Sequence, residues 1–191
     1  MVTPYEPPLR KAVFLDRDGV LIKSNVVDGM PISVLTLDEM QILPGVPEAL
    51  RDLHEAGFLL IVATNQPNVA SGRQRRETIE MMNLRLRNRL LIDDIKVCYH
   101  NDADGCACRK PKPGLLIEAA TQWSIDLTAS YMIGDRWRDI DAGAAVGCRT
   151  ILIQRFYREP LHIQPDLSVA SLGEAARAIL LHTGFPRPGA G

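Results

Sequence analysis

The chain contains the stretch Ala12-Val13-Phe14-Leu15-Asp16-Arg17-Asp18-Gly19-Val20. Its apolar first part, with a β-branched and an aromatic side chain, is typical of a buried strand. The apolar run ends at Asp16, so the carboxylates of Asp16 and Asp18 follow the carboxyl end of that strand, where parallel α/β sheets place their chemistry. Gly19 permits a turn that lets both carboxylates face one point. The stretch therefore predicts an α/β fold with an active site at the carboxyl edge of its sheet.

Strand and helix patterns alternate along the chain. Short apolar runs closed by polar residues predict strands at 11–15, 59–63, 95–99, 131–133 and 150–153. Helix patterns, several of them bounded by Pro or Gly, lie at 47–56, 74–90, 114–123, 138–146 and 172–181. This alternation predicts βαβ units and a parallel sheet covered by helices on both faces.

Length and composition predict one domain. The chain has 191 residues, of which 46% are hydrophobic, enough for one α/β core. We expect a domain spanning 1–191, with its core at about 11–181 and loose Pro- and Gly-rich ends at 1–8 and 182–191.

Charge and hydropathy exclude several classes of partner. The formal net charge of -1 gives no argument for nucleic acid or an anionic membrane. The arginines at 73–89 share their helix with an apolar stripe, which favours a solvated helix face over a nucleic-acid site. No apolar run has the roughly 18 residues that span a bilayer, and the first ten residues lack the core of a signal peptide. We expect a cytoplasmic monomer that binds neither nucleic acid nor membrane.

Three further polar motifs complete a set with the first. They are Ala63-Thr64-Asn65-Gln66, Cys106-Ala107-Cys108-Arg109-Lys110-Pro111-Lys112-Pro113-Gly114 and Ile133-Gly134-Asp135-Arg136-Trp137-Arg138-Asp139. Hydrolysis of a phosphate ester needs a positioned nucleophile, a cation and a proton source. Asp16 and Asp18 can supply the nucleophile and the proton source, and Asp135 would bring a third carboxylate to the same edge. Acidic groups that converge in this way repel one another unless a hard cation lies among them, and Mg²⁺ suits such oxygen ligands.

Other residues of these motifs can bind the phosphate. Thr64 and Asn65 end the second predicted strand with a hydroxyl and an amide that can donate to phosphate oxygens. Lys110 supplies a compact positive charge for the same group.

Cysteine and histidine cluster before and within the third motif. Cys98-x-His100 and Cys106-x-Cys108 offer three thiolates and one imidazole, a closed tetrahedral set for structural Zn²⁺. The alternative is a group of reduced thiols that binds no metal, and the adjacent Cys-Arg-Lys-Pro favours zinc. Zinc would fix the loop that carries Arg109 and Lys110. Cys148 stands apart, and we expect it only to pack in the core.

In their order, the motifs resemble the haloacid dehalogenase (HAD) superfamily of aspartate-nucleophile phosphatases, over about residues 12–153. Together they look specifically like the branch of heptose-bisphosphate and histidinol phosphatases, for which the third motif is the narrowest signature. The resemblance implies a three-layer Rossmann-like fold with no separate cap domain. It makes Asp16 the nucleophile that forms an aspartyl-phosphate, and Asp18 the acid that protonates the leaving group and then activates water.

The resemblance also implies ligands and substrate. Mg²⁺ would be held by the Asp16 carboxylate, the Asp18 backbone carbonyl and Asp135. Substrate and phosphate contacts would come from Thr64, Asn65, Gln66, Arg109 and Lys110. The substrate implied is a small phosphorylated sugar, D-glycero-D-manno-heptose 1,7-bisphosphate, which would lose its 7-phosphate.

Alternatives remain for the substrate and for the class of protein. Histidinol phosphate or another sugar phosphate fits the motifs equally well. A non-catalytic, zinc-stabilised binding module is disfavoured by the intact pair Asp16 and Asp18. The long connections 23–43 and 99–113 should lie over the carboxyl edge of the sheet, and we expect them to determine specificity.

Overall fold

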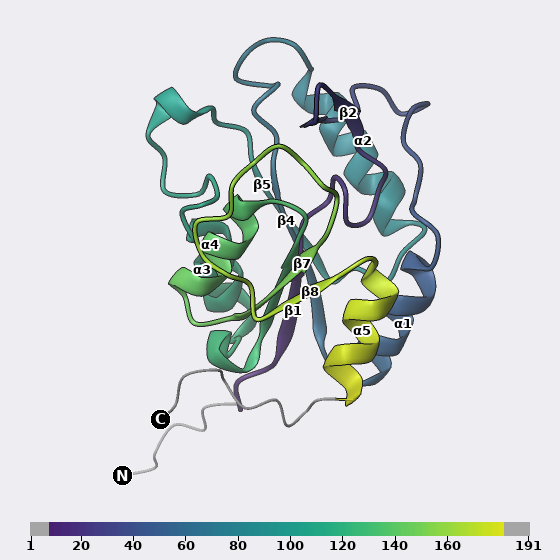
Figure 1. Cartoon of the computed structure of the whole chain (residues 1–191), viewed down its shortest axis with the longest axis vertical. Coiled ribbons are helices and arrows are strands. Elements are labelled where there is room, and N and C mark those ends of the chain that lie inside the picture. The colour runs from purple at the N-terminus through teal and green to yellow at the C-terminus, as the bar shows by residue number, and fades with distance from the viewer. Residues whose placement is uncertain (1–7, 182–191) are drawn as a thin grey trace.

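A six-stranded parallel sheet organises residues 8–181, the part of the chain that this computed structural model describes. The strand order is β5-β4-β1-β6-β7-β8 (Figure 1). The strands are β1 (Ala12–Leu15), β4 (Leu59–Asn65), β5 (Asp94–Cys98), β6 (Tyr131–Gly134), β7 (Arg149–Ile153) and β8 (Leu167–Val169). From β1 the chain adds strands on one side and later on the other, so β1 adjoins the switch point where such sheets bind ligands.

Helices cover both faces of this sheet. One face packs against α1 (Val46–Glu55), α2 (Arg76–Arg87) and α5 (Leu172–Leu181), and the other against α3 (Gly114–Trp123) and α4 (Trp137–Ala145) (Figure 1). Short 3-10 turns lie at η1 (Asp102–Asp104) and η2 (Leu127–Ala129). The three-layer α/β fold is therefore as the sequence predicts.

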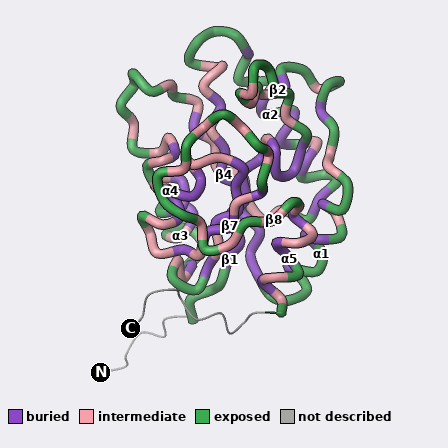
Figure 2. Tube along the Cα trace, in the orientation of Figure 1, coloured by how far each residue is buried: buried purple, intermediate pink, exposed green. Residues whose placement is uncertain are grey.

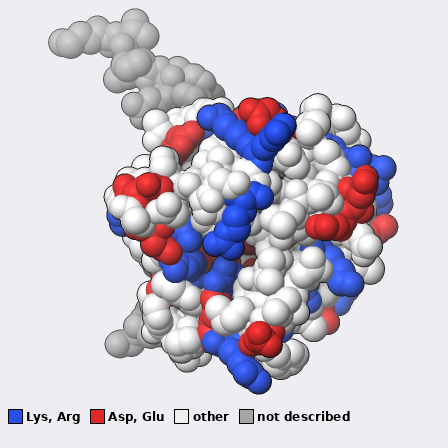
Figure 3. All heavy atoms as spheres, turned by 90° about the horizontal axis from the view of Figure 1, so that it is seen from above, with Lys and Arg blue, Asp and Glu red and all other residues white. Residues whose placement is uncertain are grey.

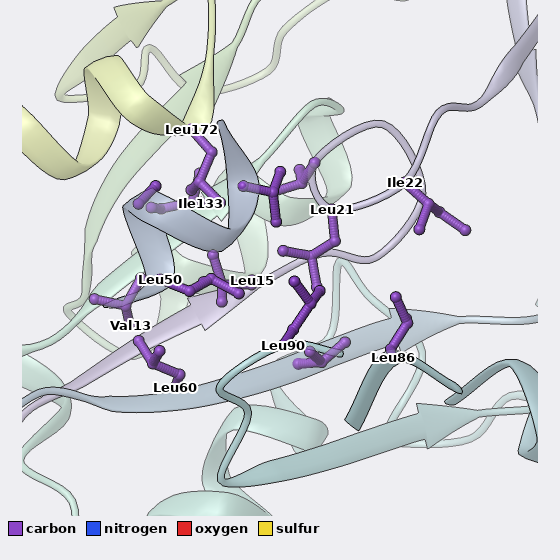
Figure 4. Packing of buried hydrophobic residues seen from close by; sticks show 14 of the residues in the cluster. Val13, Leu15, Leu21, Ile22, Leu50, Leu60, Leu86, Leu90, Ile133 and Leu172 are labelled. Carbon is purple, nitrogen blue, oxygen red and sulfur yellow. The ribbon is translucent and has the colours of Figure 1, made fainter. Parts of the chain in front are cut away.

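The alternation of β1 explains the two layers. Val13 and Leu15 pack with Leu50 and other residues of the α1, α2 and α5 side (Figure 4). Ala12 and Phe14 belong to the core under α3. All four residues of β1 are fully buried, and the buried trace runs through the centre of the molecule (Figure 2). A strand buried on both faces is the signature of a helix-covered parallel sheet.

The sequence patterns did not predict β8 or a small hairpin. The hairpin pairs β2 (Asn25–Val27) with β3 (Met30–Ile32) through a turn at Asp28 and Gly29, both with positive φ. Such Asp-Gly turns are a hairpin signal, but the exposed side chains of β2 show no alternation that would indicate a strand. The hairpin lies within the 23–43 connection, above the carboxyl edge of the sheet (Figure 1).

None of the helices within residues 8–181 is long and apolar enough to cross a membrane. The expectation of loose ends at 1–8 and 182–191 falls, apart from Pro8, outside the described residues.

Candidate active site and metal-binding cluster

Three acidic side chains meet at the carboxyl edge of the sheet. Asp16 follows β1, Asp135 follows β6, and Asp139 lies in the first turn of α4. One oxygen of each lies within 4.8 Å of the others, and the residues are only 8%, 5% and 2% exposed. A set of oxygen ligands of this kind suits a hard divalent cation. The structure thus brings Asp16 and Asp135 together as predicted, and adds Asp139.

Two glycines allow these carboxylates to approach. A Cβ atom at Gly19, where φ is +82°, would lie 1.7 Å from Asp135 Oδ2. A Cβ atom at Gly134 would lie 2.1 to 2.3 Å from atoms of the Asp139 side chain. Because these neighbours are buried parts of the site, a side chain at either position would displace a carboxylate.

Lys110 bridges two of these carboxylates, those of Asp16 and Asp139. Its ammonium is buried and donates to Asp16 Oδ1 at 2.8 Å, Asp139 Oδ1 at 2.5 Å and the Ala63 carbonyl at 2.6 Å. Burial opposes its charge, but the carboxylates of Asp139 and Asp16 outweigh this and raise the pKa of Lys110. Lys110 is therefore a fixed positive charge at the site.

The carboxylates remain incompletely neutralised. Burial, followed by the charges of Asp16 and Asp139, raises the pKa of Asp135 well above its ordinary value. Burial also raises the pKa of Asp139 to about 6, although Lys110 opposes this shift. Asp135 Oδ1 is buried and has no hydrogen-bond partner within residues 8–181. An orphaned anionic oxygen beside two more carboxylates fits a bound cation.

Asp18 points to a different set of partners. Its Oδ2 accepts a hydrogen bond from Gln66 at 2.8 Å and forms an ion pair with Arg17 at 3.1 Å. Gln66 also donates to Thr64 Oγ1 at 2.8 Å, and both of these residues are buried. Gln66, predicted to contact the substrate, thus connects Asp18 to Thr64 in this structure.

Asn65 braces the backbone of Lys110. Its amide donates to the Lys110 carbonyl at 3.0 Å, and its oxygen accepts from the Lys110 amide at 3.1 Å. The predicted phosphate donor therefore also fixes the position from which the lysine side chain extends.

A small polar pocket of about 50 Å³ opens over these groups. Its floor includes Asp16, Asp18 and Lys110, and part of its wall is Pro31 and Ile32 of β3. The 23–43 connection thus contributes to the site, as predicted.

A second, larger cavity of about 300 Å³ shares a wall with the first and is lined by arginines. They are Arg73, Arg109, Arg136 and Arg138, and the last two also line the smaller pocket. Viewed onto the carboxyl edge, basic side chains gather across the middle of the face (Figure 3). The predicted residue Arg109 lines this cavity and is absent from the lining of the smaller pocket.

One carboxylate holds two of these arginines. Asp102 accepts from Arg109 Nε at 2.8 Å and from Arg138 Nη1 at 3.4 Å. The Arg138 guanidinium also lies over the Trp137 ring, 4.6 Å from its centroid. Arg136 is engaged differently, in a two-point ion pair with Glu159.

The cysteine and histidine residues shortly before Arg109 form a tight cluster. Sγ atoms of Cys98, Cys106 and Cys108 lie 3.2 to 3.7 Å apart, and His100 Nδ1 lies 3.3 Å from Cys108 and 3.6 Å from Cys98. Four ligands around Zn²⁺ with bonds of about 2.3 Å would be about 3.8 Å apart. The predicted set is therefore gathered at nearly tetrahedral spacing, with ligand types that fit zinc.

Sequence reasoning missed several contributors. Asp139 lies in the same motif as Asp135, four residues later, and this spacing alone did not predict that it would join the acidic cluster. Arg17 is fully buried, donates to Asn83 at 3.3 Å and pairs with Asp18. Tyr157 donates to Asp135 at 2.7 Å from a loop that has no motif. The position of Arg17 between Asp16 and Asp18 was a possible signal for its role, whereas the sequence around Tyr157 carries no such signal.

Comparisons with known proteins agree with this geometry. A family model described as HAD-hydrolase-like matches residues 107–175. The chain is 35% identical over 150 residues to D-glycero-β-D-manno-heptose-1,7-bisphosphate 7-phosphatase of Pseudomonas aeruginosa, covering 76% of this chain and 82% of the relative. The enzyme of the same name from Photorhabdus laumondii is 35% identical over 184 residues, covering 88% and 94%.

A solved structure gives the same result. The crystal structure of D,D-heptose 1,7-bisphosphate phosphatase from B. bronchiseptica, complexed with magnesium and phosphate, superposes with a TM-score of 0.75. It is 30% identical in sequence, and the match covers 90% of this chain and 98% of the other.

Proposed function

Because this chain belongs to the HAD phosphatase family of the D-glycero-D-manno-heptose-1,7-bisphosphate 7-phosphatases, we propose that it hydrolyses the 7-phosphate of that sugar bisphosphate. The observation that carries the choice of substrate is the pair of adjoining cavities: the smaller has the carboxylates and Lys110, and the larger adds Arg73 and Arg109 to the two arginines that the cavities share. A sugar with phosphates at both ends would place one in each.

The reaction proceeds in two steps. An Asp16 carboxylate oxygen attacks phosphorus while the bond from phosphorus to the sugar oxygen breaks, and Asp18 gives its proton to that oxygen. Asp18 then takes a proton from water, whose oxygen attacks the aspartyl-phosphate and releases inorganic phosphate with Asp16 restored. Gln66 holds Asp18 in reach, and Lys110 binds the transferred group while it orients Asp16.

The acidic cluster would hold Mg²⁺, which supplies charge neutralisation for the phosphoryl group when bound. Asp16 and Asp135 are the proposed side-chain ligands, together with the Asp18 backbone carbonyl, and Asp139 lies close enough to support them. The orphaned Asp135 Oδ1 supports this proposal.

The cluster of Cys98, His100, Cys106 and Cys108 would hold a structural Zn²⁺. We propose that this ion fixes the loop from which Arg109 reaches the larger cavity and Lys110 the smaller. Because all four protein ligands would be engaged, the ion would have no open position for chemistry.

The proposed substrate can be tested by comparing kcat/KM, with Mg²⁺, for both heptose 1,7-bisphosphate anomers, heptose 7-phosphate and histidinol phosphate. The bisphosphate should be preferred to heptose 7-phosphate, because only the bisphosphate can occupy the arginine-lined cavity. Arg109→Ala should lower kcat/KM for the bisphosphate about tenfold or more, as expected for a lost charged hydrogen bond, and leave that for heptose 7-phosphate nearly unchanged, because Arg109 lines the larger cavity and not the smaller pocket.

The exposed Arg51, on α1, provides the matched control as Arg51→Ala. A preference of about a hundredfold for histidinol phosphate, roughly 3 kcal/mol in transition-state binding, would refute the heptose assignment. It would leave the phosphatase assignment intact.

A further inference from the structure

The loop between β7 and β8 contacts the acidic cluster through Tyr157. The Tyr157 hydroxyl donates to Asp135 Oδ2 at 2.7 Å and lies 2.9 Å from Ser24 Oγ. Because the phenol has a single proton, Ser24 must be the donor in the second contact. The hydroxyl therefore connects Asp135 to the segment that leads into the β2–β3 hairpin.

The two oxygens of Asp135 have different surroundings. Oδ2 accepts the hydrogen bond of the Tyr157 hydroxyl and lies so close to Gly19 that a Cβ atom there would be 1.7 Å away. Oδ1 is buried and has no partner within the described residues. The carboxylate is therefore fixed through one oxygen, which leaves the other available to a cation.

The loop that carries Tyr157 is itself held at several points. The Arg155 guanidinium donates twice to the Gly19 carbonyl, at 2.8 and 3.0 Å. The Arg158 amide donates to the Gly29 carbonyl at the hairpin turn, at 2.8 Å. With these contacts on either side, the Tyr157 ring is placed by the fold and can orient a neighbour.

We infer that Tyr157 is a positioning residue for the cation: its hydroxyl holds Asp135 in the rotamer that presents Oδ1 to the acidic cluster. The inference rests on the proposed function, because it needs a divalent cation at Asp16 and Asp135. A partner that orients a metal-binding carboxylate commonly changes metal affinity when it is removed. Tyr157 is therefore expected to affect the binding of the cation more than the chemical step.

The test is Tyr157→Phe, which removes the hydroxyl and keeps the ring. Mn²⁺ binding to the purified full chain, without substrate, can be followed by the loss of the free-ion EPR signal. The variant should raise the Mn²⁺ dissociation constant about tenfold. In assays, the Mg²⁺ concentration for half-maximal rate should rise in parallel, while kcat at saturating Mg²⁺ stays within about threefold of wild type. A merely structural role would not separate these two quantities.

Two variants serve as controls. Tyr131→Phe makes the same chemical change at the amino end of β6, away from the acidic cluster, and should leave the Mn²⁺ dissociation constant unchanged. Ser24→Ala removes the other contact of the Tyr157 hydroxyl. It should change the Mn²⁺ dissociation constant by less than about twofold, because the hydrogen bond from Tyr157 to Asp135 remains. Thermal unfolding of each variant establishes that the folded protein is being compared.

Three outcomes would overturn the reasoning at different points. An unchanged dissociation constant in Tyr157→Phe would refute the positioning role, as would an equal loss in Ser24→Ala. If Asp135→Asn bound Mn²⁺ as tightly as wild type, the proposed cation site itself would be wrong, and the role of Tyr157 with it.

Discussion

Replacing Lys110 by methionine should strongly lower the free energy of unfolding. Methionine keeps the apolar stem of the side chain, but the ammonium that contacts buried Asp16 and Asp139 is lost. Removing one partner of a buried ion pair typically costs about 3–5 kcal/mol, because the other charge is left uncompensated. Folded domains are stable by only about 5–15 kcal/mol, so the variant should fold but unfold at a much lower urea concentration.

The measurement is urea unfolding followed by circular dichroism, in buffer without added Mg²⁺. Lys23→Met, at an exposed lysine, should change the free energy of unfolding by less than about 0.5 kcal/mol. Lys110→Met combined with Asp139→Asn should recover part of the loss, since one uncompensated carboxylate is removed. A loss below about 1 kcal/mol in Lys110→Met would refute the conclusion that the charge of this lysine stabilises the buried carboxylates of Asp16 and Asp139.

Asp16→Asn should abolish turnover and keep the fold, because the amide lacks the nucleophilic charge. The control Asp38→Asn, at an exposed aspartate, should retain wild-type activity. Turnover well above background in Asp16→Asn would contradict the nucleophile assignment. Asp18→Asn should lose less activity on an aryl phosphate with a good leaving group than on a sugar phosphate, since the aryl oxygen needs little protonation; equal losses would argue against its role as the acid. The Cys108→Ala variant should bind less zinc than the expected one ion per chain and should have a higher KM, with Cys148→Ala as the control. Full zinc occupancy of Cys108→Ala in elemental analysis would exclude Cys108 as a ligand.

The sequence predicted those parts of the fold that depend on local patterns. The continuous apolar run of β1 and the Pro- and Gly-bounded helix α1 are both found within one residue of their predicted limits. The short edge strand β8, Leu-Ser-Val, is half-exposed and carries too few residues to show a pattern. Its place in the sheet depends on pairing with β7, which is a tertiary contact.

Some residues of the candidate site could also be predicted from local patterns, and others depend on tertiary contacts. Asp16 and Asp135 were predictable because each directly follows an apolar strand, and parallel strands bring their carboxyl ends together. The placement of Gln66 against Asp18 was not predictable, because strand direction alone does not decide whether a neighbouring amide faces substrate or protein. Tyr157 lies 22 residues after Asp135, and only the folded path of its loop brings them into contact.

β1 sets a limit on how this chain can change. Its side chains alternate between two cores. Asp16 continues the strand, since its backbone N–H donates to the Ile133 carbonyl at 2.9 Å. Inserting or deleting one residue between 12 and 15 would exchange the two faces and put Leu15 or Arg17 in the place of Asp16, the proposed nucleophile. The 23–43 connection has no such constraint, since lengthening it would alter the wall of the pocket and leave the register of the sheet unchanged. Laboratory evolution of new substrate ranges should therefore accept changes of length in that connection and reject them in β1.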